Sequence, residues 1–141
     1  MEILKSQRQT AQKVWDDFEN PKKNLVLVGA ATCGRAAGAL DVIDEFKREL
    51  SAAGLGDVEV VETACIGLCY AEPLVEVRAA GVPPILYSNV HAKDVSKIVS
   101  DHIKGGKVVK EKAEAVMGDD DFDGIAAFKK HPMVALQKRI V

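Results

Sequence analysis

Three cysteines are the residues of this 141-residue chain whose type and spacing could do chemistry. Cys65 and Cys69 are separated by three residues, and Gly67 between them frees the backbone to curl so that both sulfurs face one point. Cys33 comes well before this pair and directly precedes Gly34. Thiolates in such positions can ligate a metal ion or an iron–sulfur cluster, or act as redox thiols.

Each of these chemistries has a competing interpretation. An odd number of cysteines without a secretory signal argues against a structural disulfide framework. Thiol–disulfide chemistry is poorly matched, because no Cys-x-x-Cys is present. A [2Fe-2S] cluster requires four protein ligands, and the chain has three cysteines. The plain alternative is that each cysteine is a small buried hydrophobic residue.

The apolar pattern predicts the elements that position these cysteines. An almost wholly apolar run at 24–28 is typical of a buried strand, and it places Cys33 in the turn before the next helix, where exposed N–H groups favour an anion. The loop with Cys65 and Cys69 lies between two alternating segments. The pattern predicts strands at 24–28, 58–63, 74–78 and 84–88, and helices at 34–50 and 92–104.

This order of elements predicts an α/β fold. The crossover helix at 34–50 implies a parallel pair of strands, and the later strands add a hairpin that turns near Gly81. A thioredoxin-like arrangement, with a mixed four-stranded sheet flanked by helices, satisfies both demands. It would bring the turn at Cys33 close to the loop at 65–69.

The chain is expected to divide into three parts. Residues 1–20 form an amphipathic helix that packs one face onto the domain, residues 21–106 form the thioredoxin-like domain, and residues 107–141 form a tail. The apolar positions of the first helix are Ile3, Ala11, Val14, Trp15 and Phe18.

Composition excludes several classes of function. The net charge of -2 gives no positive field for nucleic acid, and no stretch approaches the ~20 apolar residues of a membrane span. We therefore expect a cytoplasmic protein. His91, His102 and His131 lack metal-ligand spacing. No glycine-rich dinucleotide fingerprint occurs, so no flavin or NAD site is expected.

Two segments carry a family resemblance. Val-Gly-Ala-Ala-Thr-Cys-Gly-Arg-Ala-Ala-Gly-Ala at 28–39 and Thr-Ala-Cys-Ile-Gly-Leu-Cys at 63–69 resemble the thioredoxin-like [2Fe-2S] ferredoxin family, within a match over roughly 24–104. The resemblance implies that Cys33, Cys65 and Cys69 bind the iron of a [2Fe-2S] cluster. The family's remaining cysteine falls on Val28, which cannot ligate iron. Either an oxygen donor such as Thr32 or another chain completes the cluster, or the domain has lost it and serves docking.

Within that family, the resemblance is strongest to the N-terminal domain of the NADH-binding flavoprotein subunit of complex I-related hydrogenases and formate dehydrogenases. Pro73–Val75 and Tyr87–Val90 contribute to it, and residues 131–141 resemble the linker to a flavin domain. The resemblance implies a piece of a longer subunit, not active alone, with the other subunits of an NAD(P)-linked oxidoreductase as partners. Its apolar stripes could also support a homodimer.

Overall fold

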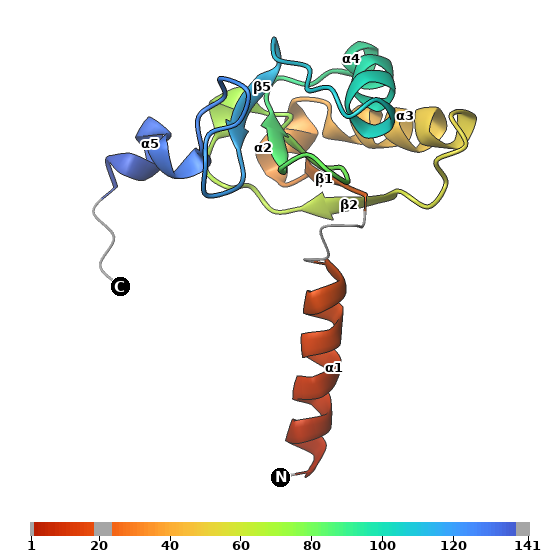
Figure 1. Ribbon diagram of the computed structural model, residues 1–141, viewed down its shortest axis with the longest axis vertical. Helices are drawn as coiled ribbons and strands as arrows, with labels where there is room; N and C mark the ends of the chain where they lie inside the picture. The colour runs from red at the N-terminus through yellow and green to blue at the C-terminus, as the bar shows by residue number, and fades with distance from the viewer. Residues whose placement is uncertain (1, 19–23, 138–141) are drawn as a thin grey trace.

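The computed structural model of the chain describes residues 2–18 and 24–137 (Figure 1). The strands are β1 (Leu25–Gly29), β2 (Glu59–Thr63), β3 (Val75–Arg78), β4 (Ile85–Tyr87) and β5 (Ala113–Val116). The α-helices are α1 (Glu2–Phe18), α2 (Thr32–Ala36), α3 (Ala39–Ala52), α4 (Ala92–Lys97) and α5 (Pro132–Ala135). Two short 3-10 helices are η1 (Cys69–Ala71) and η3 (Phe128–Lys130), and η2 (Ile98–Lys104) is a π-helix that continues α4. None of the helices described is long and apolar enough to cross a membrane.

The strands form one mixed sheet in the order β2-β1-β3-β4-β5. β1 and β2 are parallel, as the crossover predicts, and the remaining pairs are antiparallel. The predicted count of four strands is wrong, because β5 adds a fifth from the segment assigned to the tail. Its short sequence, Ala-Glu-Ala-Val, has little β-propensity, and its pairing with β4 is irregular between Leu86 and Tyr87.

The two faces of the sheet are covered differently. Alternate residues of β1 and β3 pack against α3, α4 and η2, where Val26 and Val28 meet Phe46 in the main core. Full burial of each such side chain contributes about 1.5–3 kcal/mol. On the opposite face Leu74 and Leu86 belong to a smaller cluster, against which Met117, Phe128 and Met133 pack from the C-terminal segment. The cysteine loop lies on this second face.

The crossover is divided into two helices. The prediction of one helix over 34–50 is wrong, because α2 ends before Gly38, whose φ of +97° lies in the left-handed region. Glycine adopts this conformation without the steric cost that a Cβ would bring. The break turns the chain sharply, and it leaves Cys33 on a short helix of its own.

The first helix does not pack along the domain. α1 projects from the body (Figure 1), and its Ile3, Leu4, Val14 and Trp15 side chains are exposed, so the expected docking of its apolar face is wrong. Its C-terminal end contacts β3, where Arg78 Nη1 donates to the Phe18 carbonyl at 3.1 Å and the guanidinium lies 4.6 Å from the ring centre.

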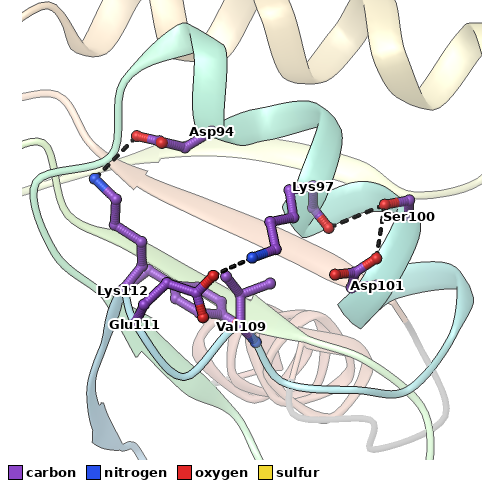
Figure 2. A network of polar contacts seen from close by, with 8 residues as sticks. Asp94, Lys97, Ser100, Asp101, Val109, Glu111 and Lys112 are labelled. Carbon is purple, nitrogen blue, oxygen red and sulfur yellow. Dashed lines mark hydrogen bonds and ion pairs between the residues drawn. The ribbon is translucent and has the colours of Figure 1, made fainter.

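The segment after η2 is tied back onto α4. Lys97 pairs with Glu111, and Lys112 Nζ lies 3.0 Å from Asp94 Oδ2 (Figure 2). The Lys97–Glu111 pair is exposed and the Lys112–Asp94 pair is partly buried, and ion pairs near the surface contribute about 1 kcal/mol or less. The buried Val108 and Val109 in the main core therefore hold this segment more than the charges do.

Candidate functional site

The loop between β2 and η1 brings two of the cysteines together. Cys65 Sγ and Cys69 Sγ are 3.6 Å apart, and the backbone N–H of Gly67 donates to Cys65 Sγ at 3.3 Å. Gly67 has a φ of +94°, a conformation that a residue with a Cβ rarely adopts. The loop therefore curls so that the Gly67 N–H points at the Cys65 sulfur. The Cys69 sulfur faces the Cys65 sulfur from the other end of the loop.

The separation of these sulfurs has a chemical meaning. It is far longer than the ~2.05 Å of a disulfide bond, so the two thiols are not linked. Two thiolates each ~2.3 Å from one tetrahedral metal ion stand ~3.8 Å apart. The pair thus has the spacing of two ligands on a single tetrahedral iron.

The third cysteine is held next to this loop by the end of the parallel strand pair. Cys33 is half-buried on α2, and the Ala30 N–H donates to the Thr63 carbonyl at 3.0 Å, which joins the two segments that lead to the cysteines. Arg35 reinforces the junction, because it donates to the Ala30 carbonyl at 2.8 Å and to Glu62 at 2.7 Å. The three cysteines therefore lie near one another.

The electrostatic environment of Cys65 is mixed. The hydrogen bond from Gly67 lowers its pKa, but the contact with the Cys69 thiol, desolvation and the nearby charges of Cys69 and Glu72 raise it more. The net effect is a raised pKa. In the metal-free chain this thiol is held protonated, and it must lose its proton to bind a metal.

A cavity of about 320 Å³ opens beside the cysteine loop on the second face of the sheet. Its wall is largely apolar and includes Leu27, Leu74 and Leu86, while Cys65 and Glu72 supply polar groups. Glu72 is missing from the set of residues that the sequence pattern singles out. The signal that could have found it is a charged residue inside the otherwise apolar run 71–75.

Glu72 is buried, with 6% of its surface exposed. Its Oε2 accepts a hydrogen bond from the Leu74 N–H at 2.8 Å, and its Oε1 has no hydrogen-bond partner among the residues described. The carboxylate presses against two glycines: a Cβ on Gly29 would come within 2.8 Å of Oε2, and one on Gly34 within 3.3 Å. Glu72 thus lies between the segment that carries Cys33 and the loop that carries Cys65.

The two positions considered for a fourth ligand differ in their surroundings. Val28 is fully buried in the main core. Because side chains alternate along a strand and Leu27 and Gly29 line the cavity, Val28 points to the opposite face of the sheet. Thr32 is exposed at the start of α2. Across 2–18 and 24–137, no three His, Cys, Asp or Glu side chains are gathered as a single-ion site.

Comparison with known proteins defines the class. Solved structures of a thioredoxin-like [2Fe-2S] ferredoxin from Aquifex aeolicus superpose with TM-scores of 0.59 and 0.56, at 21% and 23% identity, over 70% and 65% of this chain and 96% of theirs. The fold is therefore thioredoxin-like, which confirms the predicted fold class. No profile of a known protein family matches the chain.

Sequence relatives carry the assignment further. A curated protein named Ferredoxin, 2Fe-2S from Clostridium pasteurianum is 35% identical over 99 residues, covering 64% of this chain and 94% of the relative. NADP-reducing hydrogenase subunit HndB of Solidesulfovibrio fructosivorans is 31% identical over 87 residues, covering 62% and 69%. The chain belongs to the thioredoxin-like [2Fe-2S] ferredoxin family and is a distant relative of that hydrogenase subunit.

Proposed function

We propose that this chain is an electron-transfer domain, which binds a [2Fe-2S] cluster through Cys33, Cys65 and Cys69 within a multi-subunit NAD(P)-linked oxidoreductase. The observation that carries the proposal is the 3.6 Å separation of the Cys65 and Cys69 sulfurs in a loop curled by Gly67. A [2Fe-2S] cluster has two ligands on each iron, so this pair suits one iron and leaves Cys33 to the other.

When bound, such a cluster supplies one-electron redox chemistry. The chain's own residues would tune it. The Gly67 N–H that donates to Cys65 Sγ draws charge from the sulfur, and hydrogen bonds to ligand sulfur are one means by which proteins set the reduction potential. The largely apolar wall of the cavity lowers the local dielectric on one side of the site, which also affects the potential.

The surface beside Cys69 suits an approaching redox partner. Cys69 is exposed, and the neighbouring Tyr70 and Ile66 have 72% and 41% of their surface exposed. Electrons pass between centres in close contact, so an exposed ligand with an apolar rim favours transfer to another subunit. The relationship to a protein named as a hydrogenase subunit supports such a partner.

The test is anaerobic reconstitution of the purified chain with iron and sulfide. We expect two irons and two acid-labile sulfides per chain, with the visible absorption of a [2Fe-2S] centre that bleaches on reduction. Cys65→Ala and Cys69→Ala, which leave no donor atom, should each lose most of the iron. Ile66→Ser, an exposed change in the same loop, is the matched control and should retain it.

The second candidate function is docking by a cluster-free domain. It is favoured by the number of cysteines, three where a cluster takes four ligands, and by the exposed apolar side chains of α1. The same experiment separates the two functions. A wild-type chain that stays colourless and iron-free after reconstitution would support docking and contradict electron transfer.

A further inference from the structure

Three thiolates leave one coordination position of a [2Fe-2S] cluster open. This inference rests on the proposed function and asks which group of the chain fills that position. A suitable group must carry a donor atom, lie between the two cysteine segments, and lack another partner. Val28 has no donor atom and faces the main core, and Thr32, at the start of α2, is not part of the cavity wall that Glu72 shares with Cys65.

Glu72 meets all three conditions. Its carboxylate is nine-tenths buried, and one oxygen, Oε1, has no hydrogen-bond partner among the described residues. No ion pair found among those residues includes it. A buried polar oxygen without a partner costs about 1–3 kcal/mol, and more when charged, so buried carboxylates are normally paired or bound to a metal. An unpartnered buried carboxylate oxygen is therefore a candidate to bind a cation.

The backbone around Glu72 is shaped to admit this side chain. A Cβ at Gly29 would lie 2.8 Å from Oε2 and one at Gly34 would lie 3.3 Å from it, so the carboxylate packs directly against the backbone of both glycines. Gly34 directly follows Cys33, and Glu72 lines the same cavity as Cys65. The two glycines and the Leu74 N–H thus aim the carboxylate between the cysteine segments.

We propose that Glu72 is the fourth protein ligand of the cluster and binds iron through Oε1. Oε2 keeps its hydrogen bond from Leu74, which fixes the orientation of the carboxylate as outer-shell hydrogen bonds fix metal ligands elsewhere. A carboxylate carries the same single negative charge as the thiolate it replaces, so the total charge of the ligand set is that of four cysteines. Carboxylate oxygens bind iron in other proteins.

The deciding experiment compares Glu72→Gln with Glu76→Gln in the reconstituted chain. Glu76 lines the same cavity, but its carboxylate is paired with Arg78 at 2.7 Å, which makes it the matched control. We expect E72Q to release iron to a chelator at least tenfold faster than wild type, and to shift the electron paramagnetic resonance g values of the reduced protein. E76Q should match wild type in both measurements. E72C should regain slow release, with the spectrum of a cluster held by four thiolates.

Unfolding of the metal-free proteins separates ligation from a structural role. The amide side chain introduced by E72Q could still accept from the Leu74 N–H, and the substitution removes a buried charge. The denaturation midpoint of metal-free E72Q should therefore equal or exceed that of wild type. A lower midpoint together with unchanged g values would assign Glu72 to structure and overturn the proposal.

Failure of this inference is distinguishable from failure of the proposed function. If wild type binds the cluster and E72Q matches it in iron release and g values, Glu72 is not a ligand and the electron-transfer function stands. If Thr32→Val loses iron and E72Q does not, Thr32 is the fourth ligand of the cluster. A wild-type chain that takes up no iron would overturn both.

Discussion

Gly34 is the residue on which the turn at Cys33 depends. A Cβ there would lie 2.0 Å from the Gly29 carbonyl oxygen, closer than any packing allows. In an open helical position alanine is more favourable than glycine by about 1 kcal/mol. At Gly34 the steric contact reverses that sign, and we expect Gly34→Ala to lower the free energy of unfolding by about 1–3 kcal/mol, as overpacking does. Urea denaturation measures the change.

Gly56 supplies the control for this substitution. No atom lies within 4 Å of a Cβ placed there, and Gly56→Ala should change stability by no more than about 0.5 kcal/mol. G34A should also retain less iron after reconstitution, because the displaced turn carries Cys33. Equal stability of G34A and G56A would show that the turn relaxes freely and that Gly34 does not fix the site.

At the residue scale, the sequence identifies the cysteines more readily than their surroundings. Cys65 and Cys69 could be paired from a short spacing with glycine between them, and the structure brings their sulfurs to 3.6 Å. Glu72 could not be assigned in the same way. Its carboxylate packs against Gly29 and Gly34, which are about 40 residues earlier in the sequence. The pairing of β1 with β3 brings these glycines next to Glu72.

At the scale of elements, long periodic segments were predictable and short ones were not. The strand at β1 and the helix at α3 follow apolar patterns that any core would impose. β5 was missed because four residues with Glu114 among them carry little pattern, and tertiary pairing with β4 decides their state. The break at Gly38 was missed because the apolar positions continue across it.

The first helix provides a prediction at this scale. Val14 and Trp15 have 65% and 59% of their surface exposed on α1, although their spacing suggests a packed face. Replacing both with serine should change the free energy of unfolding by less than about 1 kcal/mol, since exposed positions contribute little. Phe46→Ala, in the main core, should cost about 3–5 kcal/mol in the same denaturant series. A loss above about 2 kcal/mol in the serine variant would mean that α1 packs against protein in solution.

At the scale of the whole molecule, one polar chain crosses the main core. The Val109 N–H donates to Tyr87 Oη at 3.3 Å, and the Tyr87 hydroxyl lies 2.8 Å from His102 Nδ1. Burial raises the pKa of Tyr87 to about 12, so the phenol stays protonated and shares its hydrogen bond with a neutral group of the histidine ring. These hydrogen bonds link Tyr87 on β4 to His102 on η2 and to Val109 in the segment after η2. They therefore hold that segment against the sheet. None of these partners could be inferred from the spacing of the histidines.

The same histidine should make stability depend on pH. Burial lowers the pKa of His102 to about 4, whereas an unfolded histidine titrates near 6.5. Between pH 6.5 and pH 4, His102 is therefore protonated in the unfolded chain and neutral in the folded chain. The stabilisation is fully present above about pH 6.5, and it declines as the pH falls towards 4. The linkage relation gives a loss of about 2 kcal/mol at pH 5 and about 3 kcal/mol at the acid limit.

Urea denaturation at pH 7.5 and pH 5 tests this dependence with a histidine variant and a control variant. His102→Gln removes the titrating group, so the loss between the two pH values should shrink by about 2 kcal/mol whatever the variant's absolute stability. Ser96→Ala, at an exposed position of α4 that carries no titratable group, should keep the wild-type loss. Asp94 and Asp121 have lowered pKa values, so the stability that these carboxylates contribute is lost only below pH 5. The change between pH 7.5 and pH 5 therefore does not include them. If H102Q loses as much stability as wild type, the acid sensitivity does not arise from the Tyr87–His102 pair, and the polar chain through the core must be drawn differently.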